Sequence, residues 1–355
     1  MTAPGTSSTA ANTNSTTAKL STILAHVLLP LTLGFILSSC DQNTQDPNTI
    51  VKEPNKTTSS TLTEPALTEA LKHYQHAQIH TLHATSSCVE ALSSNLDRFL
   101  AAPTQLLLNK NQLALQHCLD LYIPVHTLIK NDSNQALQTL TAPLITSVYS
   151  TPILPGYVDY LLQYPNSGIV NDITLALSEQ SLRGQQGLTD SGEISIGFEV
   201  IAFILMGEQR YNQSLAPRPA TDFEEPNASR RRQYLTIVVS LLQQDLTALQ
   251  TVLEDVITRT QQKIQQHSQQ AALRTTKNIL NTMLIHIEQQ SVDSLSMGYW
   301  ELLKYSAPQD DSSETSSEPS KGSTLATYLK WPQETPDLSH EAFTAQLKAS
   351  LQRLQ

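Results

Sequence analysis

Apolar residues recur at helical spacing along most of this chain, and Pro-rich breaks separate the recurring segments. Helical periodicity covers the ranges 65–100, 104–130, 133–149, 170–182, 191–207, 228–266, 268–305 and 340–354. The breaks at 152–156 and 216–219 each contain two prolines. The pattern predicts an all-α fold of two helical-bundle-like lobes, an N-terminal lobe over 65–215 and a C-terminal lobe over 216–355 that includes a low-complexity loop at 306–322.

Composition agrees with helices rather than sheets. The 355 residues include only 11 Gly, and aromatic residues make up 5% of the chain, so the turns and aromatic strands of a sandwich or barrel are not expected. The formal net charge of −10 would repel the phosphates of nucleic acid, and no nucleic-acid partner is expected. The sequence also lacks His-Glu-x-x-His, Cys-x-x-Cys, Gly-x-Ser-x-Gly and a phosphate-binding glycine loop, which disfavours hydrolases built on those templates.

The N-terminus has the pattern of an export signal. An apolar run of 15 residues, Ile23 to Leu37, is too short to span a bilayer comfortably and has the length of a signal-peptide core. It ends in Leu37-Ser38-Ser39-Cys40, which resembles a bacterial lipobox, whose cysteine carries palmitate or another acyl chain after cleavage. We therefore predict a lipoprotein signal peptide over 1–39, lipidation of Cys40 and a disordered tether over 40–64. The alternative is an ordinary signal peptide with an incidental cysteine.

Lipidation would place the protein in the bacterial cell envelope, anchored to a membrane through its lipid and facing the periplasm. By resemblance to enterobacterial lipoproteins, Asp41 directly after the cysteine indicates retention in the inner membrane. That rule depends on the organism, so the outer membrane stays open as the alternative.

Two cysteines remain once Cys40 is assigned to lipid. Cys88 lies 15 residues before Pro103, and Cys118 lies 15 residues after it, in two helical segments that a break at 101–104 separates. Positions equidistant from the turn of an antiparallel helix hairpin lie side by side. In an oxidising compartment this spacing predicts a structural Cys88–Cys118 disulfide, and the alternative is two buried thiols.

Four histidines share one stripe of the first predicted helix. They are spaced by three, four and three residues, which keeps them on one face: His73, His76, His80 and His83. Neutral imidazoles at such spacings can chelate a transition metal. The apolar stripe of the same helix lies on roughly the opposite side. We therefore expect a solvated polar face and keep a metal-binding or pH-responsive surface as the alternative.

One polar residue interrupts the most apolar segment of the chain. From Phe198 to Met206 only Glu199 is polar, and an all-apolar helix belongs in the interior of a protein. Burying a carboxylate without a partner costs several kcal/mol or makes the group give up its charge. Glu199 therefore needs either a cationic side chain or a bound cation.

Several segments resemble the imelysin-like family of bacterial envelope proteins. They are PGYVDY (155–160), YPNSGIVND (164–172), LRGQQGLTD (182–190), GFEVIAFILMGE (197–208), RPATDF (218–223), RRRQYL (230–235) and DRFLAAPT (97–104). The similarity covers roughly 70–305. It implies an all-α fold of two bundle-like lobes, an envelope location, a link to iron acquisition and, for some members, metallopeptidase activity.

The chain departs from the signature of this family at its two polar positions. The signature is Gly-x-His-x-x-Glu, in which His and Glu share a helical face and can jointly hold a metal. Here Glu199 stands at the His position and Ala202 at the Glu position, while Gln186 stands where relatives tend to have a histidine. The apolar framework of the signature is retained and its ligand pair is lost.

Two interpretations of Glu199 follow from this departure. In the first, the carboxylate is paired with an arginine or hydrogen-bonded between the lobes, with Arg183 and Arg218 as candidates. In the second, Glu199 is a residual ligand of a divalent or iron cation, together with carboxylates drawn from Asp190, Glu193 and Asp222.

The function expected from the sequence is that of a membrane-anchored, imelysin-like lipoprotein. It would act as a non-catalytic binding or accessory component of iron or metal uptake, with an envelope iron-uptake protein as its partner. Loss of the ligand pair argues against an enzyme and leaves a metallopeptidase with a rearranged metal site as one alternative. A purely structural or protein-interaction module is the other.

Overall fold

The computed structural model describes residues 64–224, 228–264, 269–290, 293–305, 324–331 and 339–355. These residues form helices joined by turns and loops, and no β-strand occurs among them. The predicted all-α fold is confirmed. The predicted signal peptide, Cys40 and the predicted tether up to residue 63 lie outside the described residues, as does the predicted low-complexity loop from residue 306 to 322.

The long helices match the predicted ranges closely, except that the single range predicted over 268–305 contains two helices. The α-helices are α1 (Glu64–Ala101), α2 (Gln105–Lys130), α3 (Gln135–Val148), α4 (Pro155–Val158), α5 (Glu179–Gln185), α6 (Phe198–Met206), α7 (Ala228–Ile264), α8 (Gln269–Gln290), α9 (Asp293–Lys304), α10 (Leu325–Tyr328) and α11 (His340–Arg353). Two short 3₁₀-helices are η1 (Gly207–Arg210) and η2 (Ala220–Phe223). None of the described helices is long and apolar enough to cross a membrane.

The prediction of a helix over 170–182 is wrong in its first half. A helix begins only at α5, where Ser178 forms a capping box with Ser181. Upstream, the Asp172 carboxylate accepts hydrogen bonds from the backbone and the hydroxyl of Thr174, which closes a turn. Arg230 of α7 donates to four carbonyls of this segment, those of Ile169, Val170, Asp172 and Leu175. A distant guanidinium therefore takes the acceptors that a helix would have used.

The helix predicted over 191–207 also starts later than expected. Residues 191–197 are not helical, and α6 begins at Phe198 after Gly197, whose φ is +91°. A Cβ atom at Gly197 would lie 2.4 Å from the carbonyl oxygen of Ser147. Only glycine fits this close approach to the end of α3. Residues 198–206 therefore form one short helix, and Gly197 sets the direction in which the chain enters it.

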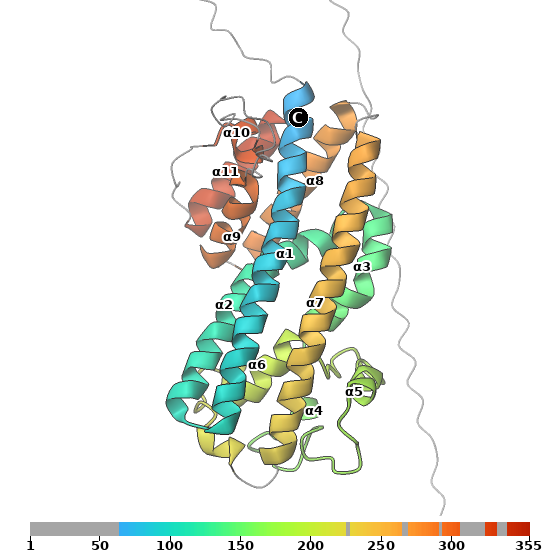
Figure 1. Ribbon diagram of the computed structural model, residues 1–355. Helices are drawn as coiled ribbons and strands as arrows, with labels where there is room; N and C mark the ends of the chain where they lie inside the picture. Colours follow the sequence, from blue (N-terminus) through green and yellow to red (C-terminus); the bar gives the residue numbers. More distant parts are fainter. Residues whose placement is uncertain (1–63, 225–227, 265–268, 291–292, 306–323, 332–338) are drawn as a thin grey trace, which may run out of the picture. The chain divides into compact units, whose positions relative to one another are not determined.

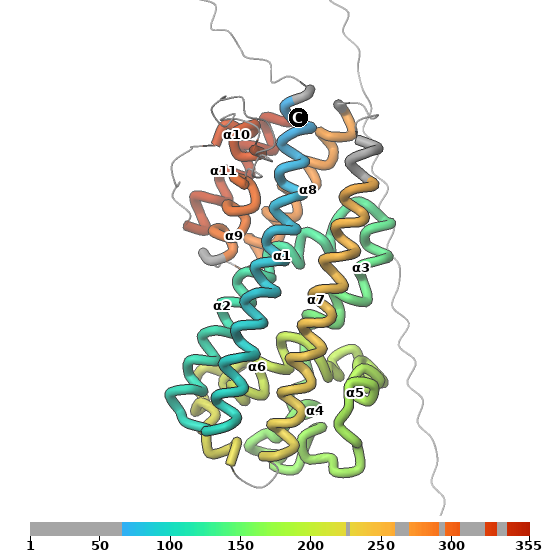
Figure 2. Tube along the Cα trace, in the orientation of Figure 1, coloured from blue at the N-terminus to red at the C-terminus, as the bar shows by residue number. Residues whose placement is uncertain are grey.

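The helices α1, α2 and α7 carry most of the packing of the described residues, and α1 lies alongside both of the others (Figure 1). The helix α3 also packs against α7. The short helix α6 contacts α2, α7 and α4, so its apolar side chains are covered from several directions. Figure 2 traces the long connection between α3 and α7 that carries α4, α5 and α6.

The described residues from 64 onward have two hydrophobic clusters. One contains α6 together with apolar side chains of α2, α3, α7 and the C-terminal half of α1. The other joins the N-terminal half of α1 to α8, α9, α10 and α11, and includes the stacked rings of Trp300 and Trp331. Because α1 contributes to both clusters, it links them covalently. The predicted lobe boundary between 215 and 216 stays a prediction.

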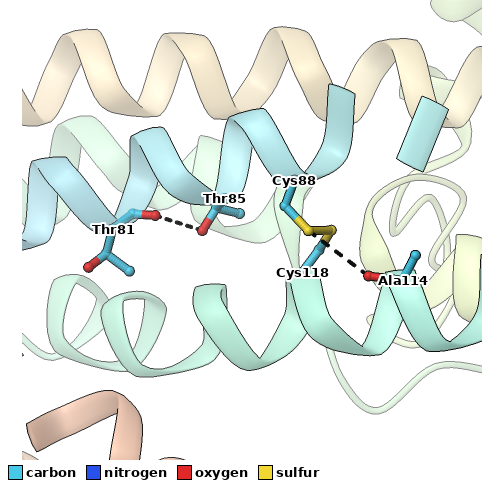
Figure 3. The surroundings of a disulfide bond; sticks show 5 residues. All are labelled: Thr81, Thr85, Cys88, Ala114 and Cys118. Atoms are coloured by element: carbon cyan, nitrogen blue, oxygen red, sulfur yellow. Dashed lines mark hydrogen bonds between the residues drawn. A yellow bond between two sulfur atoms is a disulfide. The ribbon is translucent and has the colours of Figure 1, made fainter. Parts of the chain in front are cut away.

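The predicted disulfide between Cys88 and Cys118 is confirmed (Figure 3). It joins α1 to α2, whose Cα atoms are 5.6 Å apart at this point, and 30 residues separate the two cysteines. Thr104 caps α2 by accepting a hydrogen bond from the backbone of Leu107. The break therefore acts as the turn of an antiparallel hairpin, as the equal spacing of the cysteines from Pro103 requires.

Candidate functional site

The candidate site is the first turn of α6, where the resemblance places the family's ligand pair. Every residue from Phe198 to Leu205 is buried, including Glu199, whose exposed fraction is 2%. The helix ends at Gly207, whose φ of +64° reverses the chain direction. The reversal carries η1 back along α6, and Arg210 at the end of η1 reaches Glu199.

The Glu199 cluster consists of Glu199, Arg210 and Tyr211. Arg210 donates from Nη2 to Oε1 at 2.7 Å and from Nε to Oε2 at 3.2 Å. The Tyr211 hydroxyl donates to Oε2 at 3.0 Å. Both carboxylate oxygens are therefore engaged by charge-assisted or hydroxyl hydrogen bonds, and the side-on arginine fork gives the pair a fixed geometry.

The electrostatics of the cluster show how strongly the two charges depend on each other. Burial by itself would lower the pKa of Arg210, but the hydrogen bond and the charge of Glu199 outweigh burial and raise that pKa. Burial, followed by the charge of Glu199, raises the pKa of Tyr211 and raises that of Tyr149 to about 12. The arginine therefore stays charged and the tyrosines stay neutral at physiological pH.

The arginine interpretation of Glu199 is right in kind and wrong in the two residues named. Arg183 instead binds the carboxylate of Asp245, with 2.7 Å between Nη2 and Oδ1. Arg218 binds Asp159 and Asp222. The actual partner follows Glu199 by only 11 residues, and Gly207 was the available signal, because a glycine directly after a helix commonly reverses the chain onto it.

The residues around Glu199 do not fit a metal ion. Ala202 is fully buried and has no donor atom, and Arg210 and Tyr211 occupy both oxygens of the carboxylate. A catalytic zinc site needs about three protein ligands, and structural sites need four. Across the described ranges, no group of three or more His, Cys, Asp or Glu side chains is placed to hold a metal ion.

The other carboxylates considered as co-ligands belong to separate networks. Glu193 accepts hydrogen bonds from the backbone and hydroxyl of Thr189, and Asp190 caps the backbone of Gly192. Gln186, at the position where relatives tend to have histidine, accepts hydrogen bonds from the backbone of Ser195 and Ile196. It supports the turn that precedes α6.

Asp222 belongs to the Asp159 cluster, which consists of Asp159, Arg218, Arg231, Asp222 and Tyr160. Arg231 binds Asp159 through Nε at 2.7 Å and Nη2 at 3.1 Å. Arg218 lies 3.1 Å from Asp159 and 2.8 Å from Asp222, and the Tyr160 hydroxyl donates to Asp222 at 2.6 Å. Asp159 is fully buried, and the cluster joins the segment after α4 to α7.

The histidine stripe on α1 lies largely at the surface, as expected. His76, His80 and His83 are exposed and His73 is half-buried. His73 lies 3.7 Å from Glu69, and His83 lies 3.4 Å from Glu254 of α7. His80 packs against the ring of Tyr305. The stripe is thus divided among different neighbours, and metal binding by it stays a prediction.

The fold and the site together define the class of protein. It is an all-α helical protein whose central apolar helix carries a glutamate neutralised from within the chain. The family model described as Peptidase_M75: Imelysin matches residues 70–311, and the chain belongs to the imelysin family. A search of curated proteins finds no match.

Proposed function

We propose that this imelysin-family protein is a lipid-anchored, non-catalytic binding component of metal uptake in the bacterial envelope. The observation that carries the proposal is the Glu199 cluster, in which Arg210 and Tyr211 occupy the carboxylate at the position of the family's ligand pair. Membership of the imelysin family supports an iron-related role. The guanidinium stands where a cation would have to bind, so the helix keeps its packing function without the metal chemistry.

Anchoring is proposed from the sequence. Leu37-Ser38-Ser39-Cys40 has the order of a lipobox, and Cys40 would carry the lipid. The Cys88–Cys118 disulfide supports an oxidising compartment such as the periplasm. A Cys40→Ala variant expressed in the native bacterium is expected to leave the membrane fraction, with Cys88→Ala as the control that keeps its anchor. Equal membrane retention of Cys40→Ala would contradict the anchor.

Peptidase activity is the first test of the non-catalytic role. The purified full-length protein is incubated with a peptide mixture, with and without EDTA, and products are followed by mass spectrometry. We expect no cleavage that EDTA removes, because a catalytic metal would need ligands that the first turn of α6 does not provide. Cleavage that stops with EDTA and returns with added metal would overturn the proposal in favour of a metallopeptidase.

Metal titration is the second test, and it separates Glu199 from any other ion site. Calorimetric titrations with Fe²⁺, Zn²⁺ and Ca²⁺ are run on the wild-type protein and on Glu199→Gln. We expect any metal affinity of the wild type to persist in the variant, because Arg210 already neutralises the carboxylate. Loss of binding in Glu199→Gln alone, with the fold intact by circular dichroism, would make Glu199 a ligand and contradict the proposal.

A further inference from the structure

A polar cavity of about 430 Å³ lies between α2, the residues that follow α3, and α8. Its volume falls within the range of small-molecule sites. The lining residues are Ile123, His126, Thr127, Lys130, Asn131, Tyr149, Thr151, Thr282, Ile285, His286, Gln289 and Gln290. Hydroxyls, amides and imidazoles predominate in this set.

Two buried histidines, one from α2 and one from α8, give the cavity its chemistry. The exposed fractions are 6% for His126 and 8% for His286. Each binds a buried tyrosine through Nδ1, at 3.3 Å from the hydroxyl of Tyr122 and 2.6 Å from that of Tyr299. In the described part of the chain neither Nε2 atom has a hydrogen-bond partner, so the hydrogen-bonding capacity of both rings is left for the cavity.

The tyrosines assign the same tautomer to the two rings. Within the described residues, Nδ1 of His286 lies 2.6 Å from the buried Tyr299 hydroxyl, so Tyr299 donates to Nδ1. The proton of the neutral His286 ring is then on Nε2, which acts as a donor.

The second ring has the same arrangement. Within the described residues, His126 is the hydrogen-bond partner of the buried Tyr122 hydroxyl, so Tyr122 donates to Nδ1. The proton of the neutral His126 ring is then on Nε2, which acts as a donor.

The one charged side chain in the described lining of the cavity is positive, and this lining supplies no counter-ion for it. Lys130 is exposed at the end of α2, and the described lining contains no Asp or Glu. Burial, then the charges of Lys130 and His286, lower the pKa of His126 to about 3, and burial lowers the pKa of His286. Both rings are therefore neutral at physiological pH because nothing in the lining supports their charged form.

We propose that this cavity binds a small carboxylate anion. Its carboxylate oxygens supply the counter-ion that Lys130 lacks and accept from Nε2 of His126 and from Nε2 of His286. The amides of Asn131, Gln289 and Gln290 supply further donors at the rim. The inference does not rest on the metal-uptake role, since it involves neither Glu199 nor a metal ion.

A metal ion is the less suitable occupant of the same cavity. Metal ligation needs a lone pair on each imidazole, but Nε2 of His126 carries the proton because Tyr122 donates to Nδ1. The lining offers no carboxylate to balance a divalent cation, and the ammonium group of Lys130 repels one. An anion meets the donors and the charge together.

The test uses the full-length protein and citrate as the probe, measured by isothermal titration calorimetry. Lys130→Met is expected to weaken citrate binding about tenfold or more, because it removes a charge-assisted contact. Lys110→Met is the matched control, since Lys110 is an exposed lysine of the same helix outside the cavity lining. No saturable citrate binding, or equal weakening by both variants, would overturn the proposal.

A further measurement tests the role of His286. His286→Phe, which removes the donor at Nε2, is expected to weaken citrate binding several-fold, and an unchanged citrate affinity would contradict that role. Each variant is checked for native helicity. If Zn²⁺ binds tightly, His126→Gln abolishes that binding and citrate does not bind, the cavity is a metal site and the anion proposal is wrong.

Discussion

The Glu199 cluster and the cavity between α2 and α8 contain buried ionisable groups in opposite states of balance. In the cluster, one carboxylate faces one guanidinium at 2.7 Å, and a tyrosine hydroxyl supplies the remaining hydrogen bond. In the cavity, two imidazoles and the nearby Lys130 face neutral hydroxyls and amides. The protein completes the first set of charges itself, whereas in the second set the described lining supplies no partner for the one charge, that of the exposed Lys130.

This difference separates a structural role from a binding role. A buried charge is stable only when it is paired and hydrogen-bonded, or when it neutralises. Glu199 is paired, so a ligand would have to displace Arg210. His126 and His286 are neutral instead, and within the described residues their Nε2 atoms have no hydrogen-bond partner. A buried charge that the protein pairs internally is therefore a weaker indication of a ligand site than a cavity whose described lining leaves hydrogen-bonding groups without partners.

The largest effect is expected in the Asp159 cluster. Like the Glu199 cluster, it pairs its charges within the protein, and it is the more deeply buried of the two. Asp159→Asn should lower the free energy of unfolding by about 4 kcal/mol, because it leaves Arg218 and Arg231 sharing the single carboxylate of Asp222. Urea denaturation followed by circular dichroism measures the change. The exposed Asp97→Asn is the control, with an expected change within about 0.5 kcal/mol. Equal effects would contradict the role of the cluster.

Breaking the Glu199 pair should have the next largest effect. Arg210→Met is expected to cost about 3 kcal/mol in urea denaturation, because it leaves Glu199 buried with only the Tyr211 hydroxyl. Arg259→Met, which breaks an exposed pair with Asp255, should cost at most about 0.5 kcal/mol. The double variant Glu199→Leu, Arg210→Met should recover most of the loss. Failure to recover would show that the pair is worth more than its charge balance.

Acid should destabilise the protein through the cavity. The pKa of His126 is about 3 when folded and near 6.5 when unfolded, so the unfolded chain binds more protons between these values and stability falls as pH falls. This histidine should account for a loss of about 2 kcal/mol between pH 7 and pH 5. Urea denaturation at several pH values should show a shallower dependence for His126→Gln and an unchanged one for the exposed His76→Gln.

Removing the tyrosine hydroxyl from the Glu199 cluster should have the smallest effect. Tyr211→Phe loses one hydrogen bond to a charged acceptor and keeps its ring stacked on Phe203, so we expect a loss of about 1 kcal/mol. Thermal unfolding measures it, with the exposed Tyr164→Phe as the control. A loss as large as that of Arg210→Met would mean that the hydroxyl, and not the guanidinium, holds the carboxylate.

Much of the fold was predictable because local patterns specify it. Periodicity marks α1, α2, α3, α7 and α11 within a few residues, since each presents a continuous apolar face to its neighbours. The disulfide followed from equal distances to one turn, a local geometric rule. Errors occurred where backbone groups have distant partners. Arg230 donates to four of the carbonyls between 169 and 175, and Gly197 must pass against the carbonyl of Ser147.

By itself, the sequence determined that this chain is helical, belongs with imelysin-like proteins and has lost the ligand pair at Glu199 and Ala202. Only the tertiary structure decided which arginine neutralises Glu199 and which residues surround a cavity. The reason is that charge pairing and cavity lining depend on side chains brought together from separate helices. His126 and His286 are 160 positions apart, and no periodicity in either helix indicates that both line one cavity.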